Sequence, residues 1–260
     1  MLSDPFAFGR ADLERLVAAS TEAGYRIWSP WSLHLTQVGL PESRTLLDDA
    51  GIEVPVVEAI SQWSGGPGTA QQREIDAILD VADALGATAI GACILEPEAD
   101  LAAAADGLAA SCAAAAVRGK RISLEFLPWS AAPDLRTAWM IVQQSGAPNA
   151  GLLLDTWHWT RMPGGPDVEL LKSIPGERIH YIQLCDAAAP TGLEPMAECM
   201  SARLPTGQGV VDFAQFWDAV GATGADPIIT TEVFNTALAA QGADVHARTT
   251  WTALADILDD

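Results

Sequence analysis

Basic residues are scarce in this sequence, which has 14 Lys and Arg against 34 Asp and Glu among its 260 residues. The formal net charge is −20. Proteins that bind nucleic acid need a basic surface to contact phosphates, and anionic membranes attract basic surfaces in the same way. The composition therefore argues against a nucleic-acid partner and against an anionic membrane surface.

Long apolar runs are also missing, since none reaches the ~18–20 residues needed to span a bilayer. The first five residues, 1–5, have neither the basic start nor the apolar stretch of a signal peptide. We therefore expect a cytoplasmic protein that does not associate with a membrane.

Cysteine is rare and unpaired in sequence, with four residues and no CxxC motif. Cys93 and Cys185 lie in apolar, strand-like runs, and Cys112 lies in an Ala-rich helical segment. This distribution predicts free buried thiols and does not support a disulfide framework or a zinc knuckle.

What the sequence has is a regular alternation of short apolar runs with segments of helical period. Such alternation implies a parallel sheet, and eight units within ~250 residues favour a closed (β/α)8 TIM barrel. No G-x-G-x-x-G motif or P-loop follows any predicted strand, which argues against nucleotide-binding folds. We predict one TIM-barrel domain over residues 1–260, with a short or degenerate first strand near residues 2–8. The other strands are predicted at 26–31, 52–57, 87–95, 121–127, 151–157, 178–185 and 227–234.

Four polar residues stand at the ends of four predicted strands: Glu125, Asp155, Gln183 and Glu232, spaced 30, 28 and 49 residues apart. Alternation along each strand places Glu125, Gln183 and Glu232 on the row that faces the barrel axis. Buried polar groups need partners, and a divalent cation would satisfy all four. Oxygen ligands favour Mn or Mg over Zn. Each residue alone has another explanation, such as helix capping for Asp155 or barrel packing for Gln183.

The four histidines differ in their expected positions. His158 follows Asp155 by three residues and should lie above the metal, and His34, after the second strand, can reach the site. His180 falls on the row facing the helices, which argues against it as a ligand. His246 lies in a helical segment and is expected at the surface.

A group of tryptophans near strand ends, Trp129 among them, can form the wall against a sugar's apolar face, although packing between barrel and helices explains them equally well. The Pro- and Gly-rich segment 186–211 follows a strand and is expected to act as a lid or clamp on the catalytic face.

Five stretches together resemble the xylose isomerase-like TIM-barrel superfamily, which includes ketose 3-epimerases, inosose dehydratases and isomerases, and 3-dehydroshikimate dehydratases. The matching residues are 123–129 (SLEFLPW), 149–158 (NAGLLLDTWH), 181–186 (YIQLCD), 203–209 (RLPTGQG) and 231–234 (TEVF).

The resemblance implies a site as well as a fold. The superfamily's Glu–Asp–His–Glu metal set falls on Glu125, Asp155, Gln183 and Glu232, and the departure is Gln183, where epimerases usually have His. Bacterial 3-dehydroshikimate dehydratases are similar in using Gln there. Arg203 resembles the substrate-anchoring arginine, and His158 resembles the substrate-contacting histidine. One divalent ion is implied, Mn or Mg with Co or Zn as alternatives, and a homodimer is common among such proteins.

The leading functional hypothesis is a metal-dependent isomerase or epimerase of a sugar, keto-sugar or cyclitol. It would abstract a proton next to a carbonyl through a metal-bound enediolate, with Glu125, Glu232 and His158 as catalytic groups. Arg203, His158, Trp129 and His34 would bind the substrate. A dehydratase of a cyclic keto acid or inosose is the first alternative, because elimination of a β-hydroxyl starts from the same intermediate. A non-catalytic sugar-binding barrel or partner subunit is the second alternative.

Overall fold

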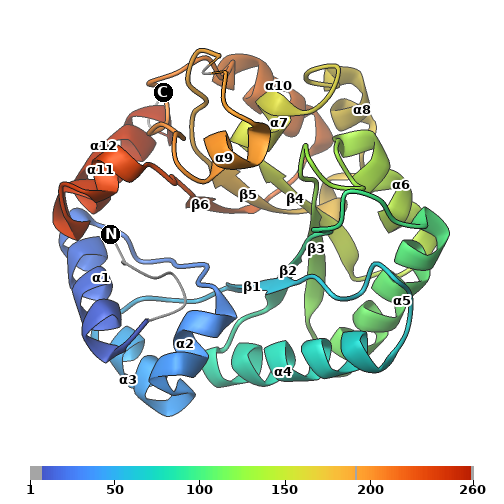
Figure 1. Cartoon of the computed structure of the whole chain (residues 1–260), viewed down its shortest axis with the longest axis horizontal. Helices are drawn as coiled ribbons and strands as arrows, with labels where there is room; N and C mark the ends of the chain where they lie inside the picture. Colours follow the sequence, from blue (N-terminus) through green and yellow to red (C-terminus); the bar gives the residue numbers. More distant parts are fainter. Residues whose placement is uncertain (1–7, 191, 259–260) are drawn as a thin grey trace.

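An arc of six parallel strands forms the centre of the molecule, and helices surround it (Figure 1). The computed structural model describes residues 8–190 and 192–258. The strands are β1 Val56–Ile60, β2 Ala89–Ala92, β3 Arg121–Glu125, β4 Ala150–Asp155, β5 Ile179–Leu184 and β6 Ile228–Thr231.

Helices follow the strands and form the outer layer. The longer ones are α1 Arg10–Ala23, α3 Leu40–Asp49, α4 Thr69–Leu85, α5 Leu101–Val117, α6 Leu135–Ser145, α10 Phe213–Thr223 and α12 Ala243–Leu258. The shorter ones are α2 Ser32–Val38, α7 Thr156–Arg161, α8 Val168–Ser173, the 3-10 turn η1 Gly176–Arg178, α9 Pro195–Cys199 and α11 Thr236–Ala239.

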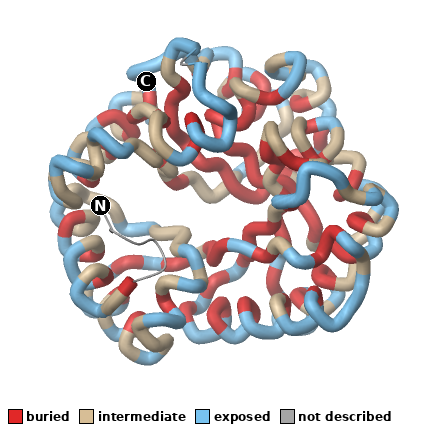
Figure 2. Tube along the Cα trace, in the orientation of Figure 1, coloured by how far each residue is buried: buried red, intermediate tan, exposed pale blue. Residues whose placement is uncertain are grey.

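Each strand pairs in parallel with the next strand along the chain, in the order β1 to β6. Six of the predicted strands are present with slightly shifted bounds, and the fold is α/β and of the TIM-barrel type. Side chains such as Ile122 and Leu124 pack outward with the helices, whereas Leu153 and Tyr181 pack together inside the barrel. Figure 2 shows the buried residues concentrated on the strands and on the inner sides of the helices. The predicted inward and outward rows are therefore confirmed at these residues.

The predicted strand at 26–31 is wrong as a continuous strand. This segment makes only isolated parallel bridges to the β1 side, at Ile27 with Glu53 and at Trp31 with Glu58. Pro30 has no backbone N–H, which limits how far a ladder can extend through the segment. The predicted strand near residues 2–8 lies outside the described residues except for Phe8, which is not in a strand.

Side chains link this N-terminal segment to β6 across the barrel wall. The Tyr25 hydroxyl lies 3.0 Å from Thr231 Oγ1 and donates to Thr250 Oγ1 at 2.9 Å. A cavity of about 820 Å³ lies beside these contacts, with Phe8 and Trp28 among its lining residues.

A β-bulge changes the direction of His180. Leu152 pairs with Ile179, but the next residue, Leu153, pairs with Tyr181, so His180 is an extra residue on β5. A bulge of this kind breaks the two-residue alternation of side chains. The prediction that His180 faces the helices is therefore wrong.

His180 instead points into the barrel near the amino ends of the strands. Its Nδ1 lies 3.2 Å from Ser123 Oγ, and a Cβ on Gly151 would lie 2.4 Å from its ring. Only glycine at position 151 leaves room for this ring. The candidate ligands lie at the opposite ends of the strands, so His180 does not belong to their cluster.

No helix among residues 8–190 and 192–258 is long and apolar enough to cross a membrane.

His180 makes the free energy of unfolding depend on pH. Burial lowers its pKa from 6.5 to about 4, and the nearby charges of Arg121 and Arg178 act in the same direction. As the pH falls from 6.5 toward 4, the unfolded state takes up this proton and the folded state does not, so stability is lost in that window.

His180→Asn removes this titration. We expect the wild type to lose about 2 kcal/mol more stability than the variant between pH 7 and pH 4.5. Urea unfolding at the two pH values measures the difference, and carboxylate titrations common to both proteins cancel. Parallel pH profiles for the two proteins would contradict the assignment.

Candidate metal centre and active site

The carboxyl ends of four neighbouring strands bring the predicted ligands to one end of the barrel. Glu125 ends β3 and Asp155 ends β4. Asp155 pairs in register with Gln183 on β5, and Glu232 follows the last residue of β6. Parallel strands end at the same edge, so residues far apart in sequence become neighbours here.

Asp155 has a structural task as well. It is the N-cap of α7, and its Oδ1 accepts the backbone N–H of His158 at 2.9 Å. The capping explanation considered for Asp155 is therefore correct, and it also fixes His158 one helical turn above the strand end.

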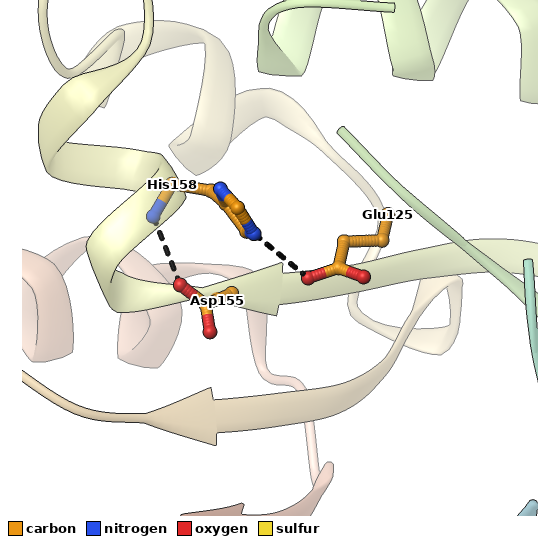
Figure 3. A group of neighbouring side chains, drawn as sticks. All are labelled: Glu125, Asp155 and His158. Atoms are coloured by element: carbon orange, nitrogen blue, oxygen red, sulfur yellow. Dashed lines mark hydrogen bonds and ion pairs between the residues drawn. The ribbon is translucent and has the colours of Figure 1, made fainter. Parts of the chain in front are cut away.

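Glu125, Asp155 and His158 form the tightest group of candidate ligands (Figure 3). One donor atom from each lies within 4.8 Å of the others. His158 Nε2 is 3.3 Å from Glu125 Oε1. Nitrogen and oxygen donors so arranged can hold a divalent cation.

The guanidinium of Arg203 joins the carboxylates of Asp155 and Glu232. Its Nη1 donates to Asp155 Oδ2 at 2.6 Å and to Glu232 Oε2 at 3.0 Å. Its Nε donates to the carbonyl oxygen of Cys199, and its Nη2 lies 3.2 Å from His158 Nε2. The side chain is 1% exposed. The predicted substrate anchor thus lies within the site and has its donors engaged with the protein.

Residues that follow β6 hold the backbone of Arg203 in place. The Arg203 N–H donates to Phe234 O at 3.0 Å, and Asn235 Nδ2 donates to Arg203 O at 2.8 Å. Asp186 in turn accepts three backbone N–H groups, including those of Gly209 and Val211. The segment predicted to act as a lid is therefore attached at the strand ends, and it contributes the positively charged guanidinium of Arg203 to the site.

His158 Nε2 lies between a donor, Arg203 Nη2, and an acceptor, Glu125 Oε1. A neutral imidazole nitrogen can satisfy only one of them: it accepts from the guanidinium or donates to the carboxylate. Its Nδ1 is buried and has no partner among the described residues. A further charged or polar group beside His158 would satisfy the partner that Nε2 leaves unpaired.

Gln183 has one end of its amide satisfied and the other free. Its Nε2 donates to Glu58 Oε1 at 2.9 Å and to Glu232 Oε1 at 3.4 Å. Its Oε1 is buried without a hydrogen-bond partner in the described part of the chain. A buried orphan carbonyl oxygen is costly, and a bound cation would satisfy it.

Glu58 is a functional candidate that the sequence analysis missed. Its buried carboxyl group accepts from Gln183 Nε2, and from the Tyr181 hydroxyl at 3.0 Å. Burial, followed by repulsion from Glu232 and Glu125, raises its pKa well above the ordinary value. The available signal was a glutamate inside an apolar run, at a point where the strand was predicted to have ended.

The cluster holds more negative than positive charge. The guanidinium of Arg203 contacts two carboxyl groups, Asp155 and Glu232, and two more, Glu58 and Glu125, are joined to the cluster through Gln183 and His158. Burial raises the pKa of Glu232 to about 8; Arg203 opposes this shift, and Glu125 and Asp155 add to it. The surplus of carboxyl oxygens and the orphan amide oxygen both fit a divalent cation.

Two predicted substrate contacts lie at different depths. The ring of Trp129 is 5.3 Å from that of His158, which places it beside the ligand group. His34 stacks on Trp31 at 5.7 Å, and Trp31 contacts Phe234, whose ring lies 5.2 Å from the Arg203 guanidinium carbon. His34 is thus linked to the cluster through the rings of Trp31 and Phe234, and its substrate role stays a prediction.

The sequence matches a known protein family. The sequence profile of the family described as xylose isomerase-like TIM barrel matches residues 17–255. A 3-dehydroshikimate dehydratase of Pseudomonas aeruginosa is 29% identical over 231 residues, or 86% of this chain and 36% of that protein. A 3-dehydroshikimate dehydratase of Pseudomonas putida is 31% identical over 119 residues, or 45% and 18%. The chain spans about a third of the length of the first of these relatives.

Solved structures share the fold at low identity. A xylose isomerase-like TIM barrel/4-hydroxyphenylpyruvate dioxygenase fusion protein has a TM-score of 0.83 at 24% identity, covering 94% of this chain and 40% of that one. The IOLI protein with a binding zinc atom has a TM-score of 0.81 at 19% identity, covering 97% of both chains. An L-ribulose 3-epimerase has a TM-score of 0.76 at 17% identity, covering 97% and 91%.

Substitution of Arg203 tests whether its positive charge stabilises the carboxylates of the cluster. Arg203→Met leaves Asp155 and Glu232 without their counter-charge, and breaking a buried pair in this way typically costs about 3–5 kcal/mol. We expect urea unfolding of the metal-free variant to show a loss of that order. Arg248→Met is the control, because Arg248 forms an exposed pair with Asp244 and should change stability little. Equal effects of the two substitutions would show that Arg203 does not carry the balance.

Proposed function

The chain belongs to the xylose isomerase-like TIM-barrel family, and on that basis we propose that it is a metal-dependent dehydratase of a small cyclic keto acid. In this reaction a proton is removed next to a carbonyl group and a β-hydroxyl leaves as water. The observation that carries the proposal is the cluster of Glu125, Asp155, Gln183 and Glu232, with the buried amide oxygen of Gln183 free of partners. Dehydration is favoured because both curated relatives are 3-dehydroshikimate dehydratases.

The ligands proposed for the ion are Glu125, Asp155, Gln183 and Glu232, with His158 beside them. When bound, a divalent cation would act as a Lewis acid on the substrate's carbonyl oxygen. The oxygen-rich set favours Mn or Mg, and the nitrogen of His158 keeps Zn and Co as alternatives.

The carboxyl groups of the cluster differ in solvent exposure, and this difference indicates which of them can reach a substrate. The Asp155 and Glu58 side chains are buried, whereas those of Glu125 and Glu232 are 14% and 18% exposed. Only the latter two can meet a substrate at the mouth of the barrel, so we assign the proton transfers to them. Asp155 and Glu58 then have supporting roles.

In the proposed sequence, Glu232 takes the proton from the carbon next to the carbonyl, and the C–H electrons form a C=C bond to the carbonyl carbon. The enolate then collapses, and the electron pair forms the new double bond as the β C–O bond breaks. Glu125, in contact with His158, supplies the proton that leaves with this oxygen as water. Glu232 then releases its proton to solvent and Glu125 takes one up from solvent, so both groups are restored and the net change is loss of one water molecule.

Arg203 positions the base Glu232 together with the supporting carboxylate of Asp155. Its contacts with Asp155 and Glu232 fix two carboxylates at once. Its predicted contact with an anionic substrate group remains part of the proposal, as does a wall formed by Trp129.

Isomerisation or epimerisation, the leading hypothesis from the sequence, is now the second candidate. It is favoured by the presence of two partly exposed carboxyl groups, since one can remove a proton and the other can return it to a different position or face. A non-catalytic sugar-binding barrel would have no use for this pair.

Metal binding is the first test. We expect Mn²⁺ or Mg²⁺ to raise the melting temperature of chelator-treated protein, because a ligand that binds only the folded state stabilises it. Glu125→Gln removes one charged ligand and should reduce the shift. The exposed Glu98, on the loop after β2, gives the matched control Glu98→Gln. If no ion shifts the wild type, the enzyme proposal fails.

Turnover is the second test. With Mn²⁺ present, 3-dehydroshikimate should give a conjugated product that can be followed by ultraviolet absorbance, and Glu125→Gln should lower the rate by about 10²–10⁴-fold. Deuterium incorporation into keto sugars in heavy water, without dehydration of the keto acid, would favour the isomerase or epimerase instead. Full activity of Glu125→Gln would refute its catalytic role.

A further inference from the structure

Glu58 stands apart from the predicted ligands, yet it is tied directly to one of them. It lies on β1 and meets Gln183 of β5 inside the barrel, although 125 residues separate the two. Nothing in the proposed proton transfers requires a buried carboxyl group at this position.

An amide can face the cluster with either end, and the two orientations differ in function. With its oxygen toward the ion Gln183 is a ligand, whereas with its nitrogen toward the ion it offers no lone pair. Packing barely distinguishes the two ends, so hydrogen-bond partners decide the orientation.

Glu232 Oε1 lies 3.4 Å from the amide nitrogen of Gln183, but Glu58 is nearer and supplies the deciding partner. Its Oε1 accepts from Gln183 Nε2 at 2.9 Å, and the Tyr181 hydroxyl donates to the same oxygen at 3.0 Å. Tyr181 also hydrogen-bonds to Ser29 and to Thr230, which fixes the position of this oxygen from the other side. Oε1 acts as an acceptor in this arrangement even when the carboxyl group carries a proton on its other oxygen.

We infer that Glu58 is a positioning residue that holds the amide of Gln183 with its nitrogen inward and its oxygen free to bind the metal ion. This inference rests on the proposed metal site. The same carboxyl group would orient a histidine at position 183, because it would accept the N–H opposite the coordinating nitrogen.

The test compares the affinity of purified protein for Mn²⁺ by calorimetry. Glu58→Leu keeps a buried side chain of similar size but removes the acceptor, and loss of such a supporting contact typically weakens metal binding by about 10–100-fold. Thr230→Val is the matched control, because Thr230 is buried in the same network and pairs with Gln183 along the β5–β6 ladder, while its hydroxyl bonds to Tyr181 and not to the Gln183 amide. It should bind Mn²⁺ about as tightly as the wild type.

An exchange of the two side chains tests the same contact if Glu58→Leu does not fold. Gln183→Glu alone places a second carboxylate against Glu58 and should impair binding. The double variant Glu58→Gln/Gln183→Glu restores an amide–carboxylate pair with the donor on β1, so it should bind Mn²⁺ at least 10-fold more tightly than Gln183→Glu.

The measurements distinguish failure of the metal site from failure of the positioning role of Glu58. A wild type that binds no Mn²⁺ removes the metal site and with it the proposed function. A wild type that binds Mn²⁺, with Glu58→Leu equal to it or with the double variant no better than Gln183→Glu, overturns only the role of Glu58.

Discussion

The contact between Arg203 and the carboxylates of Asp155 and Glu232 is the interaction on which the site depends. Buried carboxylates repel one another and lose hydration, so a cluster of them needs a compensating cation. The guanidinium supplies one positive charge, which leaves the cluster with a negative surplus. That surplus would favour a second cation. Repulsion within it adds to burial, which is the main reason that the pKa values of Glu58 and Glu232 are raised.

Different parts of the barrel supply the carboxylates and the cation that compensates them: the strand ends carry the carboxylates, and a loop carries the guanidinium. The strand ends place Glu125, Asp155 and Gln183 at one level with no need for loop rigidity. Residues 202–204 of the connection after β5 then pair with Asn235 and Asp186, and these contacts place Arg203 among the ligands. Because the segment carries the counter-charge, its movement would alter the electrostatics of the site as well as access to it.

The sequence predicted most of this arrangement because its signals were local. Alternation along a strand and a polar residue at its end were enough to find Glu125, Gln183 and Glu232. His180 was misplaced because a bulge is not visible in an apolar pattern, and Glu58 was missed because its strand extends beyond the predicted end. The bridge made by Arg203 could not be predicted, since it depends on how a long connection folds back onto two distant strands.

The proposed metal site is tested most directly by a crystal structure of the protein with Mn²⁺, in which anomalous scattering locates the ion. We expect one strong peak at about 2.0–2.3 Å from carboxylate oxygens of Glu125, Asp155 and Glu232 and from the amide oxygen of Gln183. No peak at the strand ends, or a peak bound only by surface carboxylates, would contradict it.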